Sequence, residues 1–325
     1  MKRASVAVVV AVLFAAGCSS MATKSNENAN RGTARKRVTH LTITPAGFQL
    51  PSPVQREVAA VDATSILLAG GLSASGSSTN GVFTLDPKSG HVSQLGTVPQ
   101  VFHDAAGALI GNRLEIFGGG SASSTNMVQA FDLGSRHGTV IGHLPTPLSD
   151  VSSATIGSTT YLVGGYDGHA AQSAIYAITN GSSFRKVGTL PRGLRYTAVT
   201  AVDGRVVVAG GTTGTATVNT VSVFDPNTGR VTLLAHLPAP VAHAAAFTLG
   251  GDVYVAGGQD AAGNAVSIVT RIDPATGSVA RLKPLAQPVS DAAVAELSSQ
   301  AWLIGGWRGT TVRQVLVARL AHHPA

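Results

Sequence analysis

Six Gly-Gly doublets recur along the chain at nearly constant spacing, and they constrain the fold more than any other feature. They lie at Gly70-Gly71, Gly118-Gly119, Gly164-Gly165, Gly210-Gly211, Gly257-Gly258 and Gly305-Gly306. Successive doublets are 48, 46, 46, 47 and 48 residues apart. Self-similarity at such a period is typical of an array of one supersecondary unit. The sequence therefore predicts a repeat architecture.

Each repeat contains short apolar runs in the same order. Runs such as Ser65–Ala69 and Asp252–Ala256 end in a doublet, and their length and β-branched content indicate strands. A polar loop, a third run such as Thr220–Phe224 and the turn Asp225–Gly229 follow, and Asp, Pro and Gly in that turn favour a hairpin. A fourth run then begins, as in Arg230–Leu234. Four antiparallel strands in each of six units predict an all-β, six-bladed β-propeller.

This repeat resembles the kelch motif, in which a Gly-Gly doublet follows the second strand and an Asp-Pro-x-x-Gly turn follows the third. The resemblance covers about residues 38–320. The chain departs from the motif early in the fourth strand, where kelch repeats usually have Trp and this sequence has Val92, Val231 or Val279. The resemblance implies a ligand-binding or protein-interaction module.

The sixth repeat lacks a fourth strand before the chain ends. Its runs are Ala292–Leu297, Ala301–Ile304 and Val312–Arg319. A run near the start, Val38–Thr44, precedes a Leu-Pro turn as the fourth strand of other repeats does. We therefore expect Val38–Thr44 to complete the last blade and close the propeller, because closure removes two exposed sheet edges.

The N-terminus is predicted to be an export signal. Lys2 and Arg3 precede a 13-residue apolar stretch that is too short to span a bilayer. The following Gly17-Cys18 resembles the end of a bacterial lipobox, which implies a signal peptide over 1–17, lipidation of Cys18 and a disordered tether over 18–37. The propeller would then occupy 38–320 and a tail 321–325. An ordinary signal peptide with a chance cysteine is the alternative. Lipidation would anchor the protein to a membrane of the cell envelope, facing outside the cytoplasm.

The positive charge belongs to the predicted leader and tether. The whole chain has 23 basic and 16 acidic residues, a net charge of +7. Residues 1–37 hold seven of the basic residues and one acidic residue, so 16 minus 15 leaves +1 for the rest. This distribution favours contact with an anionic membrane over nucleic acid.

With Cys18 as its one cysteine, the chain has no internal disulfide. We expect a monomer without a cofactor.

Polar residues occupy the position 14 residues before every doublet, at the predicted start of the innermost strand. They are Arg56, Asp104, Asp150, Tyr196, His243 and Asp291. Tyr166, Trp307 and Arg308 follow doublets and should lie on the same face. We predict that these nine residues surround the mouth of the central channel and bind a protein or carbohydrate ligand. The alternative is that polar residues are simply tolerated at a solvated strand start. His103 with Asp104, Asp150 and His243 gives no metal-ligand spacing, and no metal is predicted.

Two other functions remain open. Bacterial sialic acid mutarotases are similar in layout, being exported six-bladed kelch propellers that use a Glu and an Arg. Glu57 beside Arg56 matches that requirement, which makes a carbohydrate-active enzyme such as a sugar mutarotase the alternative to a binding module. The third possibility is a passive wall component without a ligand in the channel.

Overall fold

A computed structural model describes residues 40–179, 181 and 183–321, and the strands there number 26. These residues belong to one compact unit, Val38–Ala325. In this part of the chain no helix is long and apolar enough to cross a membrane. The predicted signal peptide, the lipidation of Cys18, the tether and residues 322–325 of the tail lie outside the described residues.

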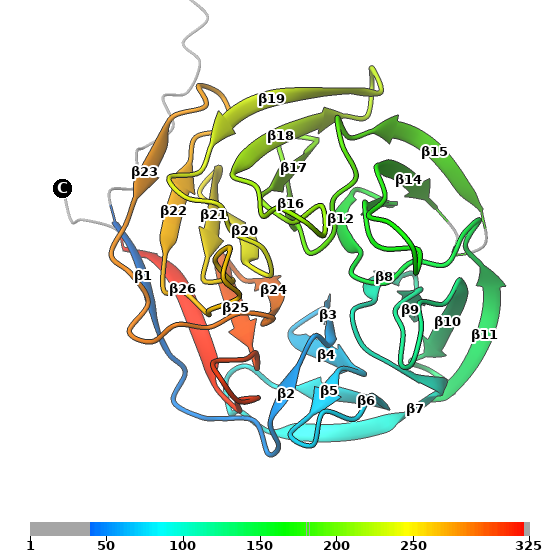
Figure 1. Ribbon diagram of the computed structural model, residues 1–325. Coiled ribbons are helices and arrows are strands. Elements are labelled where there is room, and N and C mark those ends of the chain that lie inside the picture. Colours follow the sequence, from blue (N-terminus) through cyan, green and yellow to red (C-terminus); the bar gives the residue numbers. More distant parts are fainter. Residues whose placement is uncertain (1–39, 180, 182, 322–325) are drawn as a thin grey trace, which may run out of the picture. The chain divides into compact units, whose positions relative to one another are not determined.

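The described strands form six four-stranded antiparallel blades arranged in a wheel (Figure 1). Blade 1 is β3 (Val58–Asp62), β4 (Ser65–Ala69), β6 (Thr79–Leu85) and β7 (Val92–Phe102); blade 2 is β8 (Ala106–Ile110), β9 (Arg113–Phe117), β10 (Met127–Asp132) and β11 (His137–His143); blade 3 is β12 (Ser152–Ile156), β13 (Thr159–Val163), β14 (Ala174–Ile178) and β15 (Phe184–Thr189).

The second half of the wheel continues the same order. Blade 4 is β16 (Ala198–Val202), β17 (Arg205–Ala209), β18 (Thr220–Asp225) and β19 (Arg230–His236); blade 5 is β20 (Ala245–Leu249), β21 (Asp252–Ala256), β22 (Val269–Ile272) and β23 (Val279–Arg281); blade 6 is β24 (Ala293–Leu297), β25 (Gln300–Ile304), β26 (Val315–Ala321) and β1 (His40–Pro45). A further two-stranded pair joins β2 (Val54–Gln55) to β5 (Leu72–Ser73). The all-β six-bladed propeller is thus confirmed.

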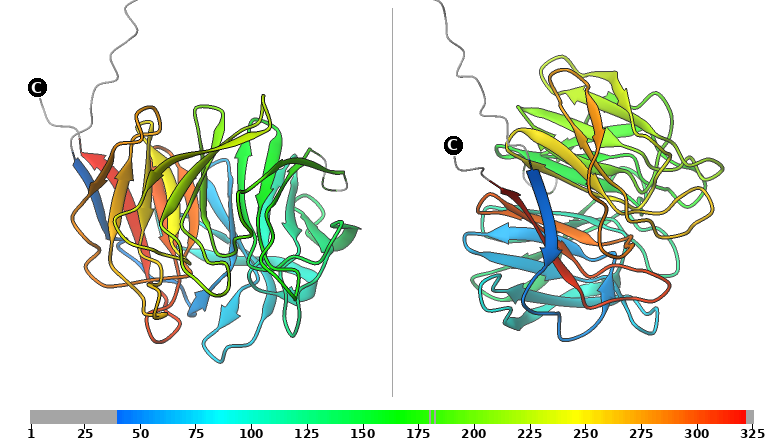
Figure 2. Two further views of the ribbon diagram at one scale, coloured as in Figure 1. Left: turned by 45° about the horizontal axis from the view of Figure 1, so that its top comes forward. Right: turned by 90° about the vertical axis from the view of Figure 1, so that its left-hand side faces the viewer.

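Closure by the N-terminal strand is confirmed as well. β1 pairs antiparallel with β26, from His40 opposite Ala321 to Pro45 opposite Leu316, and Figure 2 shows the two strands side by side. The third strand of this blade starts at Val315, three residues later than the sequence indicated. Val312 lies in the preceding loop, where its N–H donates to the carbonyl of Gly306.

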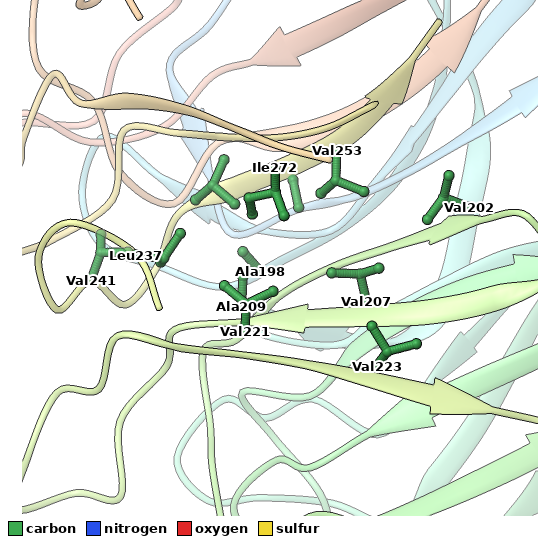
Figure 3. Close-up of a cluster of buried hydrophobic side chains, with 12 residues drawn as sticks. Ala198, Val202, Val207, Ala209, Val221, Val223, Leu237, Val241, Val253 and Ile272 are labelled. Carbon is green, nitrogen blue, oxygen red and sulfur yellow. The ribbon is translucent and has the colours of Figure 1, made fainter. Parts of the chain in front are cut away.

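Six hydrophobic clusters hold the described blades together, and each lies between two neighbours. In the cluster between blades 4 and 5, Val207 and Val221 face Val253 and Ile272 (Figure 3). All four side chains are at most 1% exposed. The core is therefore a set of seams, because each blade buries its two faces against its neighbours.

The doublets allow these seams to close. Both Gly257 and Gly258 have positive φ, 66° and 99°, which most L-residues avoid. A Cβ on Gly257 would collide with the backbone oxygen of Val289, in the segment that leads into β24 of the next blade. The N–H of Gly258 donates to that same oxygen at 2.8 Å, and the second glycine of each of the other five doublets makes the corresponding bond to the segment that leads into the next innermost strand. Each doublet is thus a point of backbone contact between blades.

Removing the closing strand should open the wheel. A chain lacking residues 1–45 loses the β1–β26 ladder and the burial of Leu41 and Ile43, which are half-buried against the seam of blades 5 and 6. Two half-buried side chains contribute about 2–3 kcal/mol, beside the ladder itself. We expect aggregation or loss of the cooperative thermal transition, measured by circular dichroism and light scattering. A chain lacking only residues 1–37 is the control and should melt like the full protein. A monomeric protein that lacks residues 1–45 and has an unchanged Tm would contradict closure of the wheel by β1.

Candidate functional site

The innermost strands of the six blades line one cavity along the axis of the wheel. They are β3, β8, β12, β16, β20 and β24, and the cavity volume is about 580 Å³. Ala, Val, Ser and Thr make up most of the wall. The six predicted strand-start residues, Arg56, Asp104, Asp150, Tyr196, His243 and Asp291, all line one end of it. We call these six residues the axial ring.

The axial ring is built by the backbone. Each of its residues donates its N–H to the carbonyl of the ring residue in the preceding blade, at 2.8–3.2 Å, so that six hydrogen bonds form a closed circle. All six residues have φ between 54° and 58°. The residues just before the ring pair with those just after the doublets, as Arg195 does with Thr212. The ring therefore lies on the same face as the loops after the doublets, which we call the doublet face.

The positive φ explains some of the ring residues better than others. Asp and His are enriched several-fold among non-glycine residues in the left-handed region, which suits Asp104, Asp150, Asp291 and His243. Their polar nature therefore has a structural explanation that requires no ligand. Arg and Tyr have no such preference, and backbone strain of this kind costs on the order of 1–3 kcal/mol. Arg56 and Tyr196 are thus the ring residues whose presence the backbone does not explain.

Arg56 connects three blades. Its Nη1 lies 3.0 Å from Oδ2 of Asp104 in blade 2, and its Nε lies 3.1 Å from Oδ1 of Asp291 in blade 6. Tyr196 reaches from blade 4 and donates its hydroxyl to the same Oδ2 of Asp104 at 3.3 Å. The Arg56 guanidinium carbon lies 5.5 Å from the centre of the Tyr196 ring. Side chains from opposite blades therefore meet over the axis.

Asp291, which neighbours Arg56 in the ring, is held by several hydrogen bonds. Its Oδ1 is 2.6 Å from Nδ1 of His243, and its Oδ2 accepts hydrogen bonds from Ser290 and Gln259 at 2.6 and 3.0 Å. Burial raises the pKa of Asp291, but the hydrogen bond from His243 and the charges of His243 and Arg56 outweigh it and hold the pKa below its ordinary value. Asp291 is thus an ionised and fully engaged carboxylate.

Asp104 differs from Asp291. Burial raises the pKa of Asp104, Arg56 lowers it, and Asp150 and Asp291 raise it again, with a net rise. Burial and the charges of Asp104 and Asp150 raise the pKa of Tyr196, so its phenol keeps its proton and acts as a donor. The ring therefore combines one firmly ionised carboxylate with a second that accepts a proton readily.

Arg195 is not among the predicted site residues, yet it belongs to this cluster. Its Nη1 lies 3.1 Å from Oδ2 of Asp150, and its guanidinium carbon lies 4.5 Å from the ring centre of Tyr166 and 5.3 Å from that of Tyr196. Tyr196 in turn stacks on His243, with ring centres 3.6 Å apart. Tyr166 thus joins the ring through Arg195. The sequence feature that could have identified Arg195 is its place directly before the ring residue Tyr196.

Trp307 and Arg308 lie on the doublet face but outside this network. The backbone of Trp307 pairs with Ser290 and Thr311, and Arg308 is exposed, with its Nη1 3.4 Å from Oε1 of Gln314. Among the described residues, no hydrogen bond or ring contact joins either side chain to the axial ring. His103 accompanies the ring, 3.7 Å from Oδ2 of Asp104 and 2.9 Å from the Ser78 hydroxyl. Within the described ranges, no group of three or more His, Cys, Asp or Glu side chains is placed to hold a metal ion.

Glu57 follows Arg56 and is buried in the seam between blades 6 and 1. Its side chain fills space left by Gly71 and Gly305, and neither carboxylate oxygen has a hydrogen-bond partner among the described residues. Burial, with a contribution from the charge of Asp291, raises the pKa of Glu57 to about 8. The carboxyl group is therefore protonated at neutral pH.

This protonation should link stability to pH. The folded protein keeps a proton on Glu57 that the unfolded chain releases above its ordinary pKa of 4.5. The free energy of unfolding should therefore fall as pH rises from about 4.5 to 8, by on the order of 4 kcal/mol. Glu57→Gln should remove this loss, so the variant should gain stability over wild type at pH 8 but not at pH 4.5, as measured by urea denaturation. Asp104 titrates in both proteins, so the difference reports Glu57. If the free energies of unfolding of wild type and Glu57→Gln change in parallel between pH 4.5 and pH 8, Glu57 ionises with its ordinary pKa in the folded protein.

Comparison with known proteins agrees with this architecture. The Kelch motif model matches residues 193–238 and 240–286, which are two consecutive repeats and include Tyr196 and His243. A solved structure titled "Structure of YjhT" matches with a TM-score of 0.74 and 15% sequence identity, over 83% of this chain and 96% of that chain. No protein of curated function matches the sequence. At this identity the likeness concerns the fold alone. The chain carries kelch repeats and folds as a six-bladed propeller similar to YjhT.

Proposed function

We propose that the protein is a binding module whose ligand contacts the axial ring from the central cavity. The main support for this proposal is the backbone of Arg56 and Tyr196. Both residues adopt a left-handed conformation that their residue types do not favour. Strain kept at a point where six blades converge on one cavity is typical of a functional site. The ligand would be a carbohydrate or a segment of a protein.

The same proposal includes the predicted cellular setting. A lipid on Cys18 would tether a monomeric propeller to the outer side of a membrane in the cell envelope, with residues 18–37 as the spacer. The basic residues of that spacer support contact with an anionic membrane. The propeller itself would then present its cavity to the space outside the cytoplasm.

The geometry favours binding over sugar mutarotation. A mutarotase of the type that the sequence suggested would offer Glu57 and Arg56 to a sugar. The carboxylate oxygens of Glu57 are buried in the seam between blades, and Arg56 is occupied by Asp104 and Asp291. Glu57 would have to move before a substrate could touch its carboxylate. Catalysis of anomer exchange therefore remains the second candidate.

Native mass spectrometry of the purified protein tests the proposal. We expect a bound small molecule or peptide, and Arg56→Lys and Tyr196→Phe should each weaken its binding at least tenfold, because each removes ring contacts while conserving size. Leu233→Ser, on the exposed outer strand β19, is the matched control and should bind normally. Ring variants that fold and bind like wild type would rule out the ring as the site. Faster anomer exchange of a sugar by ¹H NMR, abolished by Glu57→Gln, would instead support the enzyme.

A further inference from the structure

The axial ring closes the cavity on the doublet face. The Arg56 guanidinium lies near the Tyr196 ring over the axis, and the Tyr196 hydroxyl donates a hydrogen bond to Asp104. The side chains of Asp104, Asp150 and Asp291 are only 7%, 6% and 3% exposed. A molecule approaching the doublet face would therefore meet a hydrogen-bonded layer of side chains rather than an open mouth.

The opposite end of the cavity is accessible. The innermost strands run for five residues beyond the ring, about 17 Å, and this far end of the cavity is formed by Val61, Leu109, Thr155, Ala201 and Glu296. Thr155 and Glu296 are exposed. One set of contacts crosses part of this end, because Oε1 of Glu296 accepts hydrogen bonds from the Thr200 hydroxyl and the Thr248 N–H at 3.0 and 2.9 Å. These contacts involve blades 4, 5 and 6. On the other side of the cavity, the Ser153 hydroxyl of blade 3 donates to the carbonyl of Gly107 in the neighbouring blade 2 at 3.1 Å, along the wall of the cavity.

The wall of the cavity carries more acidic than basic groups. Apart from Glu57, which is protonated at neutral pH, its acidic side chains are Asp104, Asp150, Asp291 and Glu296, whereas the basic ones are Arg56 and His243. Asp150 is paired with Arg195. Both basic side chains already contact Asp291, and Arg56 also pairs with Asp104. No salt bridge joins Glu296 to a basic side chain in the part of the chain that the structure describes. Glu296, which is exposed, therefore lies at the accessible far end of the cavity.

We propose that the ligand enters the channel from the far end, opposite the doublet face, and that it is a small carbohydrate that bears a positively charged amino group. This proposal rests on the proposed function of the channel as a ligand site. Glu296 attracts the cation at the entrance, and the axial ring forms the floor that the ligand reaches. A cavity of about 580 Å³ admits a small organic amine, and a folded protein partner is too large to enter.

Cysteine modification tests the route without knowledge of the ligand. Because Cys18 is the one native cysteine, the full chain with Cys18→Ser can carry a single new thiol at Ser153→Cys, in the cavity wall between the ring residue Asp150 and the far-end residue Thr155. A methanethiosulfonate reagent bearing a trimethylammonium group is the probe. We expect Thr155→Trp, at the far end, to slow modification at least tenfold. Thr212→Trp, beside a doublet on the opposite face, is the matched control and should change the rate less than twofold.

The reverse pattern, with slowing by Thr212→Trp alone, would overturn the route, as would equal rates in both variants or an unreactive thiol. Reporters at two further depths give the same answer without a blocking residue, in case Thr155→Trp does not fold. Thr155→Cys, Ser153→Cys and Ala292→Cys, the last beside the ring, should react progressively more slowly in that order. Fastest reaction at Ala292→Cys would place the entrance on the doublet face. Reaction in denaturant controls for the intrinsic reactivity of each thiol.

The charge of the reagent tests the ligand class. Relative to free cysteine, the trimethylammonium reagent should modify Ser153→Cys at least tenfold faster than a sulfonate reagent of similar size. Glu296→Gln should reduce this preference several-fold. A preference for the sulfonate would overturn the cationic ligand. If the route and the charge preference hold but ring variants bind the co-purified molecule normally, the proposed function fails while the access route stands.

Discussion

The wheel depends on backbone contact between neighbouring blades, and the glycine doublets make that contact possible. At Gly257-Gly258, one glycine leaves room for the carbonyl of Val289 and the other donates its N–H to it. Side chains at these positions would push the next blade away. The seam between blades 4 and 5 is filled mainly by Ala and Val. Such small side chains touch across the seam only when the two blades lie close together. The periodic glycines and the hydrophobic core are therefore one constraint acting on each pair of blades.

Because this constraint repeats, the fold could be predicted from the sequence in detail. Runs ending at doublets, such as Ser65–Ala69 and Asp252–Ala256, are strands with the predicted bounds. The start of β26 was placed too early because Val312 is apolar, like the strand, yet belongs to the loop that bonds Gly306. The short β2–β5 pair was not foreseen, since two residues carry no periodic signal.

The candidate site was predictable only in part. Constant spacing from the doublets brings six polar residues to one level of the axis, and a circle of backbone bonds holds them there. Which side chains then meet depends on distances across the closed wheel, and these are not encoded in any local pattern. Arg195 reaches Asp150 and Tyr166 from a position that looks unremarkable in the sequence. Trp307 and Arg308 share the face but not the network. The lipid anchor and the ligand remain predictions.

In the proposed function, the axial ring would join stability to recognition. Its backbone bonds tie every blade to the next, so a ligand bound at Arg56 or Tyr196 would act on the whole wheel at once. Such a floor is already organised before binding, and little side-chain freedom is left to lose. The four Asp and His residues satisfy the left-handed backbone, whereas Arg56 and Tyr196 hold it against their own preference. Asp or His at all six positions would suit the same backbone, so closure of the wheel does not by itself explain Arg56 and Tyr196. They are therefore the two ring positions on which the proposed ligand site chiefly depends.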